Sequence, residues 1–105
     1  MADYVTIRRW APKAGKQETD ILPFVNESIL DAWRKIPGCL SLNFLRVHDG
    51  VSYLAVTYWE SKEHCERWAG PEGQPWRDAH RSILTRWLEL MAFQDEMEAD
   101  LLVVG

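Results

Sequence analysis

Residues 53–68 read YLAVTYWESKEHCERW, and this stretch decides the fold. Its first half, up to Trp59, is rich in aromatic and β-branched side chains, which suit the half-buried surface of a strand. Helical spacing begins after Ser61, whose hydroxyl can accept a hydrogen bond from a free backbone N–H of the first turn. We therefore predict a strand that leads directly into a short helix over residues 61–69, with Cys65 and Trp68 pointing inward.

Two further strands are predicted on the N-terminal side of this stretch. Residues 39–47 form one of them, and Asp49-Gly50 predicts a tight hairpin that pairs it with residues 51–59. Alternation predicts another strand over residues 3–10, in which Arg8 shares a face with Thr6 and Trp10. Both faces of the hairpin strands are apolar, so both faces require cover.

The helices are indicated by apolar residues at helical spacing. One helix is predicted from about residue 19 to residue 36, with Pro23 in its first turn and Pro37-Gly38 at its end. Another is predicted over residues 76–90, with Trp76 and His80 in its apolar stripe and Arg77 on its solvated face. A last strand, over about residues 97–104, would close the sheet.

The resulting order β-α-β-β-α-α-β predicts an α+β, ferredoxin-like fold with an antiparallel sheet. At 105 residues the chain is expected to form a single domain, residues 1–105. The chain has enough helix to cover one face of the sheet, so we expect a second copy to cover the other face. The protein is thus predicted to be a homodimer through the sheet face.

Composition excludes several classes of partner. The net charge of −4 gives no basic field for nucleic acid. No apolar run has membrane-spanning length and the N-terminus has no signal pattern, so we expect a cytoplasmic protein without a membrane partner. Cys39 and Cys65 match no metal-binding spacing, and we expect them to be reduced thiols. The six tryptophans exceed the needs of a core this small, which indicates a pocket or an interface.

Three residues are candidates for chemistry. His80 is either a core histidine bonded to a carbonyl, or a metal ligand or general base, since neutral imidazole suits both tasks. Trp68 is either plain packing or the wall of a pocket for a flat ligand. Arg8 would need an anionic partner if its strand face meets the helices, either a ligand carboxylate or a salt bridge. The sequence contains no nucleophile elbow, P-loop, dinucleotide fingerprint or paired carboxylates.

Several segments together resemble the antibiotic biosynthesis monooxygenase superfamily. They are PGCL at residues 37–40, VTYWES at residues 56–61, Glu63, Trp68, and AHR at residues 79–81. The resemblance covers about residues 3–104 and is stronger to the bacterial haem-degrading branch, in which a Trp on the short helix and a His on the next helix recur in this order. It implies a dimeric α+β barrel and an oxygen-dependent monooxygenase.

The haem-degrading branch implies specific roles for these residues. His80 would be the proximal ligand of haem iron, and Trp68 would press on the porphyrin and distort it. The family's Asn on the first strand is replaced here by Arg8, a bulkier and permanently charged group.

Two alternatives to haem degradation stay open. Other members of the superfamily oxidise aromatic polyketides or quinols without metal or flavin; in that chemistry Arg8 would face a phenolate and His80 would be the base. The second alternative is a non-catalytic ligand-binding or stress-related barrel. In the catalytic interpretations we expect a hydrophobic aromatic substrate to contact Arg8, Trp76, Phe24 and Phe44, in a cavity beneath the last two helices that Trp68 and His80 both face.

Overall fold

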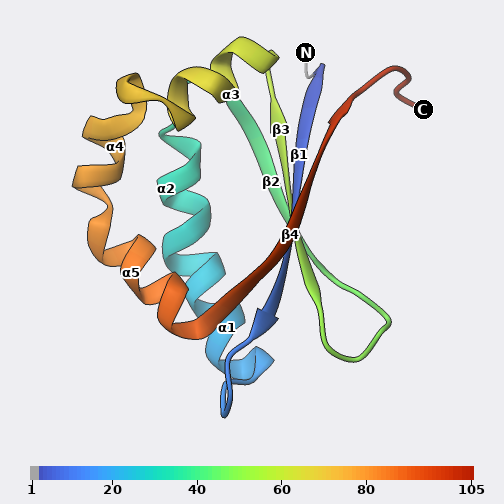
Figure 1. The fold of residues 1–105 in the computed structure, drawn as a ribbon, viewed down its shortest axis with the longest axis vertical. Helices are drawn as coiled ribbons and strands as arrows, with labels where there is room; N and C mark the ends of the chain where they lie inside the picture. Colours follow the sequence, from blue (N-terminus) through green and yellow to red (C-terminus); the bar gives the residue numbers. More distant parts are fainter. Residues whose placement is uncertain (1–2) are drawn as a thin grey trace.

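The computed structural model describes residues 3–105 as a four-stranded antiparallel sheet with helices on one face (Figure 1). The strand order is β2-β3-β1-β4, so the predicted ferredoxin-like α+β fold is confirmed. The strands are β1 (Tyr4–Pro12), β2 (Cys39–Arg46), β3 (Tyr53–Trp59) and β4 (Met91–Asp100). The helices are α1 (Glu18–Phe24), the π-helix η1 (Val25–Ile29), α2 (Leu30–Arg34), α3 (Lys62–Ala69), the 3-10 turn η2 (Pro71–Gly73), α4 (Gln74–Ala79) and α5 (Arg81–Leu90).

Strand β1 lies in the middle of the sheet and is paired on both sides. Arg8 lies opposite Ala55 of β3 and opposite Glu96 of β4. Because side chains alternate along a strand, Thr6, Arg8 and Trp10 share one face, as predicted, and the structure shows that this face meets the helices while the odd-numbered residues face away from them.

The predicted hairpin between β2 and β3 is confirmed. The Asp49 carboxylate accepts hydrogen bonds from the backbone N–H groups of Val51 and Ser52, both at 2.8 Å, and Gly50 has a φ of 78°. The β2–β3 register shifts between Cys39 and Ser41. Leu40, in this irregularity, is 48% exposed, although the alternation predicts that it faces the same side as Leu42.

The helix predicted over residues 19–36 is not regular. Pro23 lies inside α1 rather than in its first turn, and the wide π-turn η1 follows directly, with the backbone N–H of Leu30 donating to the carbonyl of Val25. A proline ring clashes with the carbonyl four residues earlier in a regular helix, and a local irregularity near it is the usual outcome. The buried residues Val25 and Ile29 of this turn both face the sheet.

The predictions for the C-terminal third are wrong in two boundaries. The helix predicted over residues 76–90 is broken at His80, whose φ of −114° and ψ of 22° leave the helical region between α4 and α5. The last strand begins at Met91 rather than 97, because the chain passes from α5 into β4 without a loop. Leu101 continues the pairing with a backbone hydrogen bond to Asp3, while Val103 and Val104 lie outside the strand and are exposed.

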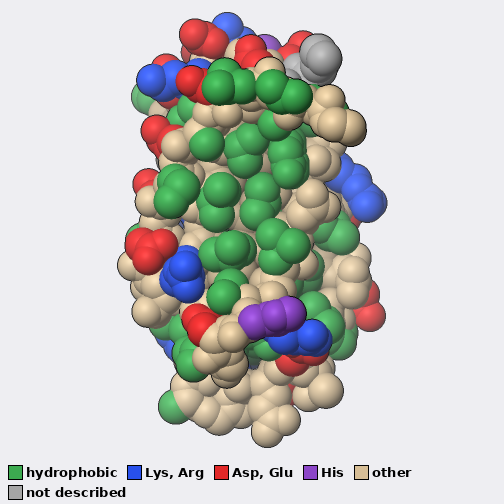
Figure 2. All heavy atoms as spheres, turned by 90° about the vertical axis from the view of Figure 1, so that its right-hand side faces the viewer, with side chains coloured by type: hydrophobic (Ala, Val, Ile, Leu, Met, Phe, Trp, Pro, Cys, Tyr) green, Lys and Arg blue, Asp and Glu red, His purple; other side chains and the backbone are tan. Residues whose placement is uncertain are grey.

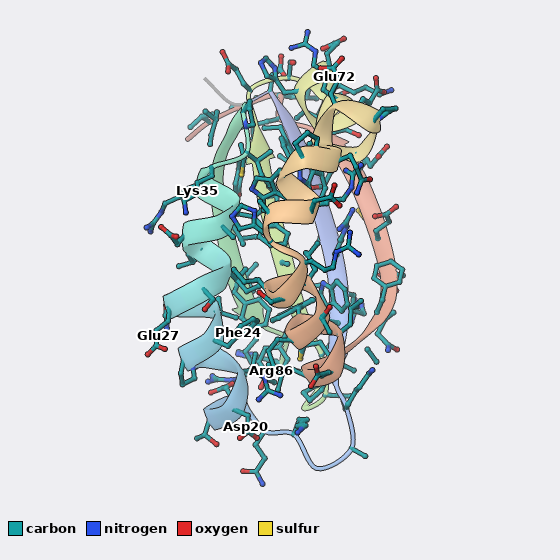
Figure 3. All side chains as sticks on the ribbon, turned by 90° about the vertical axis from the view of Figure 1, so that its left-hand side faces the viewer. Asp20, Phe24, Glu27, Lys35, Glu72 and Arg86 are labelled. Atoms are coloured by element: carbon teal, nitrogen blue, oxygen red, sulfur yellow. The ribbon has the colours of Figure 1, made fainter. Side chains whose placement is uncertain are left out.

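The helices bury one face of the sheet and leave the other open. α2 and the α4–α5 segment lie side by side in front of the strands (Figure 3). The open face carries a broad band of hydrophobic side chains (Figure 2). The expectation that the helices cover only one face is therefore confirmed. Among the described residues, no helix combines the length and apolar character needed to cross a bilayer.

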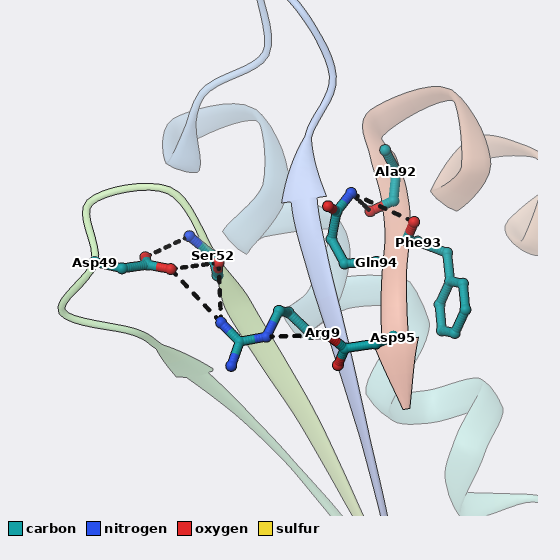
Figure 4. Close-up of polar contacts among 7 residues, drawn as sticks. All are labelled: Arg9, Asp49, Ser52, Ala92, Phe93, Gln94 and Asp95. Atoms are coloured by element: carbon teal, nitrogen blue, oxygen red, sulfur yellow. Dashed lines mark hydrogen bonds and ion pairs between the residues drawn. The ribbon is translucent and has the colours of Figure 1, made fainter. Parts of the chain in front are cut away.

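Arg9 of β1 connects the β2–β3 hairpin loop with β4 (Figure 4). Its guanidinium donates to the hydroxyl of Ser52 at 3.3 Å and lies 3.6 Å from the Asp49 carboxylate on the hairpin. On the other side its Nε lies 3.7 Å from Asp95 of β4. These contacts hold the hairpin loop against β1 and β4.

Glu18 ties α1 to the hairpin strands. Arg46 of β2 donates two hydrogen bonds to its carboxylate, both 2.7 Å long, and the Tyr53 hydroxyl of β3 donates a third at 2.8 Å. Hydrogen bonds from Arg46, and then from Tyr53, lower the pKa of Glu18 from 4.5 to about 2. Since the pKa is lowered by folding, this contribution to stability is complete above pH 4.5 and disappears as the pH falls towards 2.

We therefore expect Glu18→Gln to lower the free energy of unfolding at pH 7, and to lower it much less near pH 2, where the wild-type carboxylate becomes protonated in the folded state as well. Urea unfolding at both pH values measures the difference. The control is Glu27→Gln, which alters an exposed carboxylate in the π-helix η1. A Glu18→Gln effect that is equal at both pH values would contradict this assignment.

Candidate functional site

A cavity of about 50 Å³ lies between the helices and the sheet. Apolar side chains form most of its wall, and its polar lining comes from two threonines, one cysteine and one arginine. The lining residues are Thr6, Arg8, Trp10, Val25, Ile29, Trp33, Leu42, Phe44, Ala55, Thr57, Trp59, Cys65, Trp68 and Trp87. An apolar slot with a few convergent polar groups is typical of a small-molecule site.

Trp68 reaches the cavity from the last turn of α3. That helix begins as predicted, with the Ser61 hydroxyl accepting a hydrogen bond from the backbone N–H of His64 at 3.2 Å. The Trp68 indole packs against Trp59 and Trp33, with ring centroids 5.7 and 6.1 Å away. Its Nε1 is buried and has no hydrogen-bond partner among the described residues. Because a buried indole N–H normally finds an acceptor, this donor is available to a ligand oxygen.

Arg8 supplies the one permanent charge among the lining residues. Its Nε donates to the Glu96 carboxylate of β4 at 3.1 Å, and its guanidinium carbon lies 5.9 Å from the centre of the Trp68 ring. The expected anionic partner is therefore a protein carboxylate. The Arg8 and Glu96 side chains are 39% and 51% exposed, so water screens the pair. The two terminal guanidinium nitrogens form no hydrogen bond within residues 3–105 and can donate to a ligand.

Aromatic rings form the other end of the cavity. Trp87 meets Trp10 and Phe44 edge to face, at centroid distances of 5.4 and 5.8 Å. Phe44 also stacks on Tyr53 at 5.3 Å, which connects this wall to the Glu18 hydrogen bonds. The predicted contact residue Phe44 thus lines the cavity.

The remaining polar groups of the cavity are neutral. Trp59 donates through its Nε1 to the Thr6 hydroxyl at 3.0 Å. Burial raises the pKa of the Cys65 thiol, and burial raises that of Cys39 to about 11. Both cysteines are free, and thiols with raised pKa values stay protonated at neutral pH and are poor nucleophiles. No group of three His, Cys, Asp or Glu side chains suited to a metal ion occurs in residues 3–105.

Three predicted site residues do not line this cavity. His80 lies at the α4–α5 boundary; its Nδ1 donates to the carbonyl of Trp76 at 2.8 Å and its ring stacks on the Trp76 indole at 4.5 Å. Trp76 in turn donates through Nε1 to the carbonyl of Ala32 at 2.9 Å. Phe24, labelled in Figure 3, packs against the core that contains Trp10 and Leu90. The roles expected for these residues stay predictions.

The sequence reasoning missed two polar residues around the site. Glu96 was missed because the last strand was expected to begin at residue 97; a strand starting at Met91 places Glu96 opposite Arg8. The prediction that Arg77 lies on the solvated face is wrong, because its guanidinium turns towards α3 and donates to the carbonyls of Trp68 and Gly70. No local sequence signal indicated either contact.

Comparisons with known proteins agree with this fold. The structure resembles that of SnoaB from Streptomyces nogalater, described as a cofactor-independent oxygenase, with a TM-score of 0.63 at 15% identity, covering 99% of this chain and 97% of that one. It also resembles HapK from Hahella chejuensis, with a TM-score of 0.76 at 9% identity and coverage of 97% and 95%. For Rv0793 from Mycobacterium tuberculosis the TM-score is 0.58 at 14% identity, with coverage of 99% and 97%.

At these identities the solved structures establish the fold alone. Among curated proteins, none matches this chain. The sequence profile of the family described as "Antibiotic biosynthesis monooxygenase" matches residues 4–82, which is most of the chain. The protein therefore belongs to the antibiotic biosynthesis monooxygenase family.

Proposed function

We propose that this protein is a monooxygenase that oxidises a phenolic aromatic substrate with molecular oxygen, without a metal or a flavin. Family membership supports the reaction class. The observation that carries the substrate class is the Arg8 guanidinium beside the Trp68 ring on the wall of an aromatic cavity. Apolar walls select a flat ring, and a fixed cation favours the phenolate over the phenol.

The residues of the cavity suit the chemistry of a bound anion. A deprotonated phenol or enol can pass an electron to oxygen, and the protein's part is to hold the anion and stabilise its charge as it redistributes. The terminal nitrogens of Arg8 and the buried N–H of Trp68 are the free donors for that oxygen. The low polarity of the remaining wall strengthens both interactions.

Binding of such a substrate requires the cavity to widen. A benzene-sized guest occupies a cavity of about 150 Å³, whereas this one measures about 50 Å³. The movement must therefore come from side chains of the wall. Trp68 is a strong candidate, because no hydrogen bond fixes its indole.

The arrangement of side chains around His80 does not leave room for haem as the cofactor. The tautomer is suitable, since an Nδ1 that donates to a carbonyl leaves Nε2 free for a metal. However, the Trp76 indole stacks on the His80 ring and also meets Trp68 edge to face, 5.7 Å between centroids. A porphyrin between Trp68 and His80 would have to displace Trp76 and break its hydrogen bond to Ala32. The residues as placed do not fit the group, and the proposed reaction does not pass through it.

We also propose that the protein works as a homodimer through the open face of the sheet. Met97 and Leu45 on this face are 63% and 45% exposed, and the half-buried Ile7 and Leu54 lie beside them on the neighbouring strands. A contiguous apolar face with charged groups at its margin, including Arg9 and Asp95, is typical of an interface. A second copy is the partner that fits, because the same face on both subunits is self-complementary in a two-fold dimer.

For the reaction, we expect Arg8→Gln to lower kcat/KM for oxygen-dependent oxidation of an anthrone or quinol by roughly a hundredfold, the usual cost of losing a charge-stabilising donor. Oxygen uptake with product formation is the measurement. Arg86→Gln, which alters a cation on the exposed side of α5, is the control. Substrate binding without oxygen uptake in the wild-type protein would favour the non-catalytic binder instead.

For the cofactor, we expect haemin to give no stoichiometric Soret shift with the wild-type protein. His80→Ala should then behave as the wild type in this titration, as should the control His48→Ala. A one-to-one Soret shift that His80→Ala abolishes and His48→Ala retains would reverse the conclusion about haem.

For the dimer, we expect Met97→Glu to halve the mass measured by light scattering, because two carboxylates would be buried across the interface. Leu88→Glu on α5 replaces a leucine of similar exposure, 53%, on the helical side and should leave the mass unchanged. A monomeric wild-type protein at micromolar concentration would overturn this proposal.

A further inference from the structure

The end of helix α3 is held by a side chain from the following helix. Arg77 of α4 donates from Nη1 to the carbonyl of Trp68 and from Nη2 to the carbonyl of Gly70, the latter at 2.7 Å. We propose that Arg77 is a positioning residue, which sets the place of Trp68 in the cavity wall through these two carbonyls. We call this contact the Arg77 clamp.

The Arg77 clamp donates hydrogen bonds to backbone carbonyls at the C-terminal end of α3 that have no partner within the helix. The last four carbonyls of a helix have no partner within it. The backbone N–H of Gly70 donates a hydrogen bond to the carbonyl of Glu66, and the Arg77 guanidinium donates one to the carbonyl of Trp68. A guanidinium reaches two carbonyls at once because its donors form a rigid planar fork, which an ammonium group does not offer. Arg77 therefore supplies the missing hydrogen-bond donors to these two carbonyls and also fixes the direction in which they point.

Gly73 makes the clamp possible. It is buried in the turn η2, and a Cβ there would collide with the carbonyl oxygen of Trp68 and come within 2.7 Å of Nη1 of Arg77. The turn can approach the end of α3 closely only because this residue has no side chain. The approach then brings α4 to the distance at which Arg77 reaches back to α3.

The clamp is connected to the opposite wall of the cavity. Trp76, adjacent to Arg77, donates through its indole to the carbonyl of Ala32 on α2. α2 also carries Trp33, which lines the cavity with Trp68. One short segment of α4 thus holds α3 with one side chain and α2 with the next, and sets the separation of the two indoles.

Trp68 depends on this support because its own ring has no polar anchor. Its Nε1 is without a hydrogen-bond partner in the described chain, and no residue of α3 is fully buried. The ring is positioned by aromatic packing and by its backbone alone. Displacement of a group in a reaction site by about 1 Å can cost on the order of a hundredfold in rate.

The test is a double-mutant cycle between Arg77 and Trp68, with two readouts. The first is the exciton couplet that closely packed indoles produce in far-ultraviolet circular dichroism, which needs no activity; Trp68→Phe defines the part that Trp68 contributes. The second is kcat/KM for oxygen-dependent oxidation, which rests on the proposed function. Arg81→Gln is the matched control, since Arg81 is exposed and, within residues 3–105, its one ion pair is with Asp78.

We expect Arg77→Gln to weaken the Trp68 part of the couplet and to lower kcat/KM about ten- to hundredfold. Arg77→Lys, which keeps the charge but has a single donor nitrogen, should fall between Gln and the wild type. It gives the same comparison if the Gln variant does not fold. In the Trp68→Phe background, Arg77→Gln or Arg77→Lys should change neither readout further, because the two residues act as a unit.

Two results would overturn the proposal. One is an unchanged couplet in both Arg77 variants. The other is additive effects of Arg77 and Trp68 substitutions, which would mean that Arg77 acts on stability in general. A third result separates the two proposals. If the couplet changes as expected, but neither the wild type nor any variant oxidises a phenolic substrate, the proposal for Arg77 is supported and the proposed function is wrong.

Discussion

The central strand β1 is the constraint on which the rest of the structure depends. It is paired with β3 on one side and β4 on the other, and its side chains alternate between two different environments. Thr6, Arg8 and Trp10 point under the helices, whereas Val5 and Ile7 point to the open face. A shift of one residue in either pairing would exchange the two sets. The cavity and the apolar outer face are therefore two consequences of one register.

The wall of the cavity is built from indole rings at least as much as from aliphatic side chains. Trp59 is 1% exposed and lies beneath Trp68, while Trp10 and Trp87 close the other end of the cavity. Large flat rings that meet at edges cannot fill space as closely as branched aliphatic chains. In the proposed function, an aromatic guest would widen this cavity by displacing rings, and the same residues would serve as core and as binding surface.

Two half-buried arginines, Arg8 and Arg77, make different kinds of polar contact around the cavity. Arg8 is screened by water at the mouth of the cavity and shares its charge with Glu96, so part of its hydrogen-bonding capacity remains for a ligand. The Arg77 guanidinium donates hydrogen bonds to backbone carbonyls at the end of α3. There its positive charge lies at the negative end of the helix dipole. Arg8 is therefore suited to recognition, and Arg77 to keeping the recognising surface in place.

The sequence by itself determined the order of elements, the hairpin at Asp49-Gly50, the cap at Ser61, the inward direction of Trp68 and the strand face that Arg8 shares with Thr6 and Trp10. These follow from local chemistry: turn propensity, capping and the period of the apolar residues. Only the tertiary structure decided that Glu96 faces Arg8, that Trp76 stands between Trp68 and His80, and that Arg77 reaches back to α3. The first depends on the β1–β4 register, and the other two depend on how α4 packs against α2 and α3. Contacts between segments distant in the sequence are decided by tertiary packing, and no local pattern encodes them.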